Sequence, residues 1–526
     1  MKKNYIEIIH CFCISLVICS FSMTISAQED ETLITNVLII DGTGSEPYSG
    51  SILIKGDVIT SIFQGSSNDL KQDNLVDGMG MILAPGFLDS HSHFDQGLEA
   101  QPYAKAAITQ GITTIIRGMD GFSGRPDGKD TIVYGDHLSV IEFNDLMKDI
   151  STTVNVASFS SHNSIRSVIM RDEFRREATP LEIEKMSKLV EADMQAGALG
   201  LSTGLEYDPG IYSSTSEVIS LAKVAAKYGG KYKSHMRSED RYFWDSVNEI
   251  IEIGEKANIS VNIDHLKLAA ISLWGMDKDL ISILNDARAR GVDVTADIYP
   301  YTAWQSTITV LYPDKNFDDP REAEFILENI SSPDDILFVA HKLHPEYINK
   351  TLRQIASENK KTPAEMLSII AKESFELSQG ASAIESIIGK SMDEKDVLAL
   401  LNWKYSNVTT DGGLDCLHPR GCGSFTKVID DYIGDEGLGS IERVIHKMTG
   451  LTAKNLGIKN RGEIMVGSYA DLILFEPNQI QDNATYEQPN LLSDGIHSVW
   501  VNGERVLKNG ELTGSLPGKI ILREVN

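Results

Sequence analysis

One pattern recurs eight times between residues 86 and 411: a β-rich apolar run ends in a polar residue, and a helix-like stretch follows. Examples of the helical stretches are 180–190 and 215–229, and the second ends on a glycine pair, as helices often do. Repeated strand-then-helix order predicts an α/β fold with a parallel sheet, and eight units predict a closed, TIM-like (β/α)₈ barrel. The expected strand ends are His91-Ser-His93, Gly118-Met-Asp120, Ser160-Ser-His162, Gly204-Leu-Glu-Tyr207, Lys233-Ser-His235, Ile263-Asp-His265, Ala296-Asp-Ile-Tyr299 and Thr409-Thr-Asp411. Barrel enzymes place their chemistry at this end of the strands.

The two ends of the chain differ from this middle part. Residues 32–85 and 461–526 read as short β-rich runs broken by Gly and Asp, such as Leu33–Ile40 and Ala470–Phe475. We therefore expect one small β-sandwich domain built from both termini, with the barrel in residues 86–460. A total of 526 residues suits a large barrel with a smaller domain attached.

The seventh and eighth units are separated by an insertion at about 314–400. Its sequence is mostly polar and helical, as in 320–329 and 362–371. It is expected to lie over the barrel mouth as a lid; the alternative is a peripheral excursion without a role.

The first 27 residues resemble a secretory signal peptide. Lys2 and Lys3 precede a short apolar run (14–21), and the small residues of 24–27 precede Gln28. We expect cleavage after Ala27, export to the periplasm and a mature chain without a membrane span. A membrane anchor is the alternative, although the apolar run is short for a span. A lipoprotein modified at Cys19 is disfavoured by the bulky Ile18.

Cysteine use and net charge narrow the function classes. Only Cys416 and Cys422 remain after the expected cleavage, so the chain is not a disulfide scaffold. We expect these two to stay unpaired, because they flank a turn-rich segment placed in the active site. The net charge of −27 repels phosphate backbones, which argues against a nucleic-acid partner.

His91-Ser-His93 is the strongest single motif. Residues i and i+2 of a strand point to the same face, so both imidazoles can converge on one ion. His235 and His265 end the fifth and sixth strands. A lone histidine there is more often structural, but four at these barrel positions predict a metal site, with zinc as the favoured ion.

Asp411 ends the eighth strand, before Gly412 and Gly413. Hydrolysis needs a nucleophilic water and a base that takes its proton, and a carboxylate beside a metal fits that need. Asp411 is therefore the predicted general base. The alternative is a turn residue before the glycine pair.

These features together resemble the amidohydrolase superfamily. Longer motifs are similar to those of the N-acyl-D-amino-acid deacylase (D-aminoacylase) family, over about 33–514. They are Gly197-Ala-Leu-Gly-Leu-Ser-Thr-Gly-Leu-Glu-Tyr-Asp-Pro-Gly210, Ser234-His-Met-Arg-Ser-Glu239, Thr295-Ala-Asp-Ile-Tyr-Pro-Tyr301 and His418-Pro-Arg-Gly421. The resemblance implies that His235 and His265 hold a tightly bound zinc, that His91 and His93 form a weaker second site, and that Asp411 is the base.

The chain departs from this family after the second strand. The family carries a cysteine ligand there, and Asp120 stands in its place, in Gly118-Met-Asp-Gly121. Carboxylates also ligate zinc, and they can span two ions. We expect Asp120 to be a ligand, with one or two ions bound and with Mn²⁺ or Co²⁺ as workable substitutes. The alternative is that Asp120 only shapes the turn.

The resemblance also implies the substrate. The chain is expected to hydrolyse the amide of a small N-acyl-D-amino acid, with Arg420 pairing bidentately with the carboxylate. Tyr207 and Tyr301 are candidate hydroxyl partners. Arg420 in a structural salt bridge is the alternative. His162 is expected to be structural or to support a ligand from behind. Arg237 and Lys267 follow ligand histidines and are candidates to lie near the substrate, which the sequence leaves open.

Two other functions remain open. One is a peptidase that acts on dipeptides with a C-terminal D-residue, since the bond is chemically the same. The other is a non-catalytic binding protein on a decayed barrel, which the complete set of four histidines and two aspartates disfavours. The sequence leaves the side-chain and acyl preferences and the oligomeric state open.

Overall fold

The structure is a computed structural model that describes residues 31–65, 74–126, 138–378, 383–434 and 436–524. The expected signal peptide lies outside the described residues. Within the described ranges, no helix is both long and apolar enough to cross a membrane.

The middle of the chain holds parallel strands in two hydrogen-bonded arcs. The first runs β6–β7–β8 and the second β9–β10–β11–β12–β13–β17, each strand parallel to its neighbour. A single residue, Phe159, separates β8 from β9. Each expected strand end falls at, or within a few residues after, the end of one of these strands. The strands are β6 (Phe87–Asp89), β7 (Ile112–Arg117), β8 (Asn155–Ser158), β9 (Ser160–Ser161), β10 (Gly200–Gly204), β11 (Lys231–His235), β12 (Val261–Ile263), β13 (Val294–Ile298) and β17 (Ser406–Val408).

Helices connect these strands and bury their apolar faces against them. Helix α4 (Pro180–Gln195) begins with a capping box from Thr179 and Glu182 and with proline in its first turn. Helix α5 (Thr215–Lys227) is capped by Ser214. The other helices around the two arcs are α1 (Lys105–Ile108), α2 (Val140–Leu146), α3 (His162–Met170), α6 (Phe243–Ala257), α7 (Asp277–Ala289), α11 (Glu394–Asn402), α12 (Arg420–Asp431), α13 (Ile441–Met448) and α14 (Gly450–Leu456). This packing makes one large apolar core between helices and strands.

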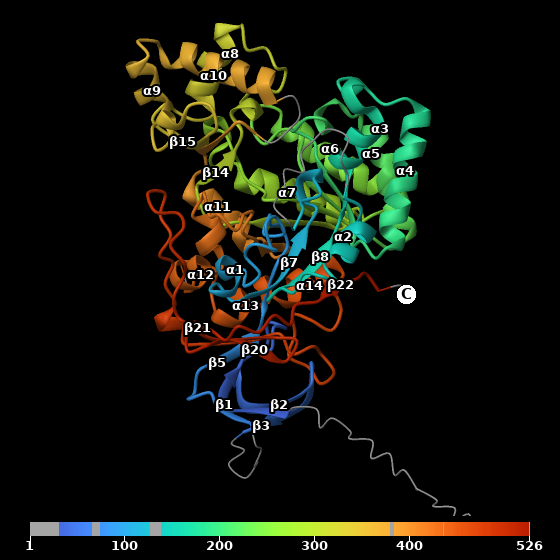
Figure 1. Cartoon of the computed structure of the whole chain (residues 1–526), viewed down its shortest axis with the longest axis vertical. Coiled ribbons are helices and arrows are strands. Elements are labelled where there is room, and N and C mark those ends of the chain that lie inside the picture. Colours follow the sequence, from blue (N-terminus) through green and yellow to red (C-terminus); the bar gives the residue numbers. More distant parts are fainter. Residues whose placement is uncertain (1–30, 66–73, 127–137, 379–382, 435, 525–526) are drawn as a thin grey trace, which may run out of the picture.

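Both ends of the chain meet in a second, mainly antiparallel sheet, seen at the bottom of Figure 1. It has nine strands and its own apolar core, to which Trp500 and Ile52 belong. The N-terminal strands are β1 (Glu31–Ile39), β2 (Tyr48–Lys55), β3 (Val58–Gln64), β4 (Leu75–Asp77) and β5 (Ile82–Pro85); the C-terminal ones are β18 (Leu472–Phe475), β19 (Ile496–Val501), β20 (Glu504–Lys508) and β21 (Glu511–Leu512). The last strand, β22 (Ile520–Ile521), differs from our expectation: it leaves this sheet and pairs with β8.

The insertion is less helical than its composition predicts. Helices α8 (Pro320–Asn329), α9 (Leu352–Glu358) and α10 (Pro363–Ser378) pack together, but β14 (Ala303–Ser306), β15 (Ile336–His341) and β16 (Glu385–Lys390) form a three-stranded antiparallel sheet. The apolar runs of β15 and β16 are short and lie in a mostly polar segment, so composition did not predict them as strands. Figure 1 shows the insertion at the end of the molecule opposite the nine-stranded sheet.

Candidate metal centre

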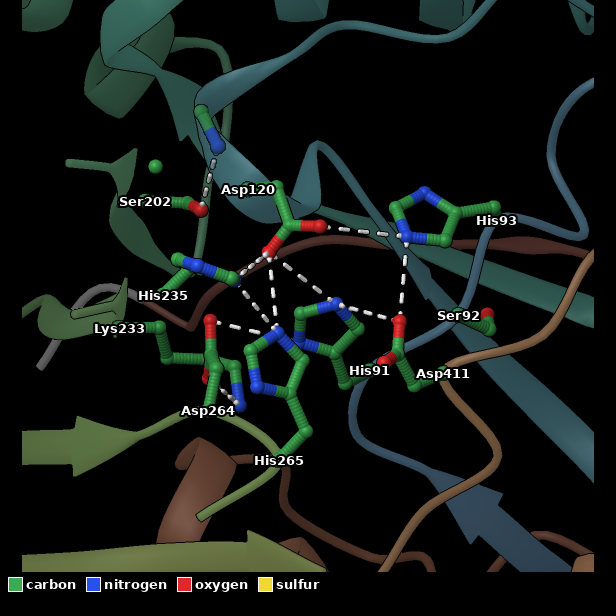
Figure 2. A network of polar contacts seen from close by, with 12 residues as sticks. His91, Ser92, His93, Asp120, Ser202, Lys233, His235, Asp264, His265 and Asp411 are labelled. Carbon is green, nitrogen blue, oxygen red and sulfur yellow. Dashed lines mark hydrogen bonds and ion pairs between the residues drawn. The ribbon is translucent and has the colours of Figure 1, made fainter. Parts of the chain in front are cut away.

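Four histidines and two aspartates meet where the parallel strands end. Their ligand atoms fall into two overlapping groups, each with all its atoms within 4.8 Å of one another. One group is His91, His93, Asp120 and Asp411; the other is Asp120, His235 and His265. Figure 2 shows these six side chains pointing toward one another, with the Asp120 carboxylate between the two groups.

The group of His235, His265 and Asp120 has the spacing of a zinc site. His235 Nδ1 lies 3.1 Å from His265 Nε2, and Asp120 Oδ1 lies 3.4 Å from His265 Nε2 and 3.9 Å from His235 Nδ1. Tetrahedral ligands bound at 2.0–2.1 Å are about 3.3 Å apart. The three side chains are buried, so an ion there is shielded from solvent.

The other group shares the second oxygen of Asp120. Asp120 Oδ2 lies 3.5 Å from His93 Nε2, and Asp411 Oδ1 lies 3.4 Å from the Nε2 atoms of both His91 and His93. His91 Nε2 and Asp120 Oδ1 are buried and have no hydrogen-bond partner. Buried polar atoms are rarely left so, and a cation between them satisfies both. The residues present therefore fit one ion or a bridged pair.

The backbone turns sharply at three of these residues. Asp120, His265 and Asp411 adopt positive φ values of 53°, 36° and 48°. A positive φ is uncommon for residues other than glycine, and such residues cluster at functional sites. The turn directs each side chain from the end of its strand toward the centre.

Three carboxylates lie behind the histidines, two of them as close partners and the third, Asp264, at a longer distance. Glu206 Oε2 lies 2.8 Å from His235 Nε2, Glu239 Oε1 lies 3.0 Å from His265 Nδ1, and Asp264 Oδ2 lies 3.4 Å from His91 Nδ1. In each case the other ring nitrogen faces the centre, as in a carboxylate–histidine–metal arrangement. Glu206 and Glu239 fall within the quoted family motifs, but the sequence assigned no role to any of the three, because these contacts join separate strand ends.

A buried lysine supports the Asp264 contact. Lys233 Nζ lies 2.7 Å from Asp264 Oδ1 and 2.5 Å from Asp297 Oδ2, and all three side chains are at most 2% exposed. Burial raises the pKa of the Asp264 carboxyl, but the charges of Lys233 and His91 outweigh it and hold that pKa at about 2. Lys233 thus keeps Asp264 ionised and aimed at His91.

Lys233→Met is expected to weaken metal binding by about 10- to 100-fold, the usual effect of losing a partner behind a ligand histidine. The measurement is metal retained against a competing chelator. Lys231→Met, two residues earlier on β11, is the matched control, because the Lys231 ammonium donates to Ser260 away from the centre. The double variant Lys233→Met/Asp264→Asn should recover part of the affinity, because it removes the unbalanced charge. Unchanged affinity in Lys233→Met would show that Lys233 does not orient His91.

Asp411 also faces a cation. Arg420 Nη1 lies 2.7 Å from Asp411 Oδ2, and the guanidinium lies over the Tyr299 ring at 4.8 Å. Burial raises the pKa of Asp411, but Arg420 and the neighbouring histidines hold it below its usual range. Asp411 is therefore an ionised carboxylate between the histidines and Arg420.

Two cavities adjoin the centre. The larger, about 250 Å³, reaches from His93 and Asp120 to Phe375 and Glu385 of the insertion. The smaller, about 40 Å³, is lined by His235, His265, Asp411 and Arg420, together with apolar residues. Tyr207 lines both cavities and lies against the His235 ring, with 4.4 Å between ring centroids.

Known proteins resemble the chain along nearly its whole length. It is 31% identical to a D-aminoacylase of Alcaligenes xylosoxydans xylosoxydans over 94% of this chain and 98% of the relative. It is also 31% identical to an N-acyl-D-glutamate deacylase of the same organism, over 93% and 96%. A family model described as "Amidohydrolase family" matches residues 413–507. The chain belongs to the D-aminoacylase family of amidohydrolases. This confirms the resemblance drawn from the sequence motifs.

A solved structure agrees with this assignment. The N-acyl-D-glutamate deacylase of Bordetella bronchiseptica, complexed with zinc and a phosphonate inhibitor that mimics the tetrahedral intermediate, has a TM-score of 0.81. It is 28% identical, over 94% of this chain and 100% of that one. Its fold therefore extends over both the parallel strands and the nine-stranded sheet.

The structure separates the two tyrosines that were candidate hydroxyl partners. Tyr207 lies at the centre, but Tyr301 lines neither cavity: its hydroxyl donates to Asp482 Oδ2 at 2.9 Å. Tyr299 instead lies beside Arg420 and is buried. Tyr299 and Tyr301 flank Pro300, and neither is among the residues that line the two cavities.

Of the other polar residues singled out in the sequence, Lys267 lies at the site, whereas His162 and Arg237 line neither cavity. His162 bonds to Glu217 at 2.9 Å, away from both cavities. Lys267 lines the smaller cavity, whereas Arg237 forms two hydrogen bonds with Glu249 and lines neither.

Our expectation about the cysteines is wrong. Cys416 and Cys422 form a disulfide with a Cα–Cα distance of 5.8 Å. The bond closes a loop around Pro419 and ties the loop after Asp411 to the first turn of α12, where Arg420 lies. The turn between the two cysteines reverses the chain, and this reversal brings their side chains together.

Proposed function

We propose that the chain is a zinc-dependent hydrolase that cleaves N-acyl-D-amino acids to a carboxylate and a free D-amino acid. The observation that carries this proposal is the place of Asp411. One of its oxygens faces the ligand histidines and the other faces Arg420, beside a cavity. The proposed base thus contacts both the proposed metal ligands and the proposed anchor of the substrate carboxylate.

His91, His93, Asp120, His235 and His265 would hold the metal, as one ion or two. When bound, zinc supplies a Lewis acid that polarises the amide carbonyl and lowers the pKa of water to about 7. Zinc is supported by the histidine-rich ligand set and by the zinc in the solved relative. A hard carboxylate in place of a cysteine also permits Mn²⁺ or Co²⁺.

Asp411 moves the protons of the reaction. Its carboxylate takes the proton of the attacking water and returns it to the leaving nitrogen as the C–N bond breaks. The charge of Arg420 lowers the pKa of Asp411, which keeps the carboxylate ionised and without a proton before the water attacks. Burial of the site excludes bulk water, which strengthens the electrostatic interactions within it.

Arg420 and Tyr207 would orient the substrate. A guanidinium pairs with a carboxylate through two parallel hydrogen bonds, and Arg420 lines the cavity that adjoins the metal centre. Among the described lining residues of that cavity, Tyr207 is the hydroxyl candidate; Tyr299 lies beside Arg420 but, like Tyr301, is not among them.

Arg420→Ala is expected to raise KM by about 10- to 100-fold, the effect of losing a charged hydrogen-bonded partner. Its kcat should fall less, because the arginine holds the carboxylate in the ground state and the transition state alike. Steady-state kinetics on an N-acetyl-D-amino acid measures both. A fall in kcat at unchanged KM would mean that Arg420 acts through Asp411 alone.

A comparison of two substrates distinguishes the proposed deacylase from the alternative peptidase. N-acetyl-D-leucine and the dipeptide glycyl-D-leucine present the same bond and the same D-residue, but only the dipeptide has a free ammonium next to the acyl carbonyl. We expect the acetyl compound to give the higher kcat/KM. A higher value for the dipeptide would favour the peptidase.

We also propose that the two parallel arcs close as one (β/α)₈ barrel over residues 86–460. Two bonds after β6 and β17 support closure: the Asp411 amide donates to the His91 carbonyl at 2.9 Å, and the His93 amide donates to the Gly412 carbonyl at 2.8 Å. The separate core of the nine-stranded sheet supports a sandwich domain built from residues 32–85 and from residue 461 to the end of β21, while β22 pairs with β8.

Export to the periplasm remains our proposal for location. It is supported by the order of charged, apolar and small residues in 1–27 and by the disulfide, which persists best in an oxidising compartment.

A further inference from the structure

The family includes enzymes that differ in the charge of their substrate's side chain. One relative is named for D-glutamate, yet it is as similar to this chain as the D-aminoacylase is, at 31% identity. Similarity therefore does not decide whether the substrate carries a second carboxylate. The charged residues that line the two cavities do bear on that choice.

We infer that this chain acts on N-acyl-D-amino acids whose side chains are neutral and largely apolar, and that it discriminates against D-glutamate and D-aspartate derivatives. The inference rests on the proposed function. A second carboxylate needs a cation that is free to pair with it, because an ionised group moved from water into a buried site without a partner is strongly disfavoured.

Lysine and arginine supply four cations to the described lining of the cavities: Arg175, Lys267, Lys315 and Arg420. Arg420 is assigned to the α-carboxylate that every substrate of this class carries. Lys267 is already bound, because its ammonium lies 2.6 Å from each oxygen of Glu239 and is buried. Neither of these two can receive a side-chain carboxylate.

The remaining two cations share a wall of the larger cavity with two carboxylates. Arg175 Nε lies 3.9 Å from Asp208 Oδ2, and the guanidinium lies over the Phe375 ring at 4.8 Å. Lys315 donates to the Thr309 carbonyl at 3.0 Å, and the nearby charges acting on it include Asp208 and Glu206. The described lining of the larger cavity has more carboxyl groups than lysine and arginine side chains, so it offers no surplus positive charge for a second carboxylate.

The rest of the lining is suited to an apolar group. Phe122, Val310 and Phe375 line the larger cavity, and Trp304, Leu311 and Ile330 line the smaller one. Glu385, also on the larger cavity, adds a carboxyl rather than a cation. The net charge of −27 further disfavours the approach of a doubly charged anion.

The experiment compares N-acetyl-D-leucine, N-acetyl-D-glutamine and N-acetyl-D-glutamate on the zinc-loaded enzyme. Glutamine has nearly the shape of glutamate without its charge, so this pair isolates charge from size. We expect kcat/KM for the glutamate derivative to be at least about 100-fold below that for leucine, and well below that for glutamine. Lys315→Met is the matched variant, because its removal should leave the leucine-to-glutamate ratio within about threefold of the parent.

Preference for the glutamate derivative, lost in Lys315→Met, would overturn the inference and make Lys315 the residue that binds the second carboxylate. The proposed function would then still stand, since D-substrates are hydrolysed. Equal rates for glutamate and glutamine would also overturn it. If no member of the series is hydrolysed, the proposed function itself fails, and the inference with it.

Discussion

Asp411→Asn is expected to lose about 10³-fold or more in kcat while it keeps its metal. The amide has the size of the carboxylate and can still accept a hydrogen bond from Arg420, but it cannot take a proton from water. General bases contribute up to about 10⁴-fold. The histidines and Asp120 remain to hold the ion, so metal content after dialysis should be nearly that of the parent.

Asp415→Asn is the matched control for this variant. It removes a carboxylate from the same loop, but from an exposed position four residues further on, and it should keep near-normal kcat. If Asp411→Asn retained near-parental activity, Asp411 would not be the base. If it lost its metal, the fall in kcat would report ligand loss instead, and Asp411 would be a metal ligand.

Asp120→Ala is expected to lose metal on dialysis, and activity with it. Its two oxygens face different ligand histidines, so the change removes one ligand from each group of the centre. Asp120→Cys restores the soft ligand that the family resemblance implies at this position and should retain zinc. The measurement is metal per chain by elemental analysis, before and after dialysis. The parent enzyme, which has Asp120, should also accept Mn²⁺ or Co²⁺ more readily than the Asp120→Cys variant does.

Asp120→Asn separates the ligand role from the turn role. Asparagine tolerates the positive φ of this position about as well as aspartate, but it lacks the charge. Metal loss in both the asparagine and alanine variants would identify Asp120 as a ligand. A full metal complement and near-normal turnover in Asp120→Ala would reduce Asp120 to a turn residue, with no part in the metal centre.

Local periodicity predicted the order of the strands well. Each expected strand end, from His91 to Asp411, lies at or just after a parallel strand, because an apolar β-branched run that ends in a polar residue is a local signal. The insertion was predicted less well. Strands β15 and β16 pair with each other, and β16 pairs with β14; their short runs carry little periodicity within a polar segment.

Only part of the metal centre could be predicted from the sequence. Histidines that are spaced by one residue, or that stand together at strand ends, are seldom required by packing, so His91, His93, His235 and His265 could be selected. Lys233, Asp264 and Glu206 could not, because their contacts form between neighbouring strands whose register the sequence does not give. The position of Tyr301 against Asp482, and the pairing of Cys416 with Cys422, likewise depend on how a turn reverses the chain.

The most direct test of a metal-dependent D-specific deacylase is hydrolysis of N-acetyl-D-leucine and N-acetyl-L-leucine by the same preparation, first stripped of metal and then titrated with zinc. We predict no turnover without metal, activity restored by zinc, and kcat/KM for the D-enantiomer at least about 100-fold above that for the L-enantiomer. Turnover that does not depend on metal, or equal rates for the two enantiomers, would contradict the proposed function.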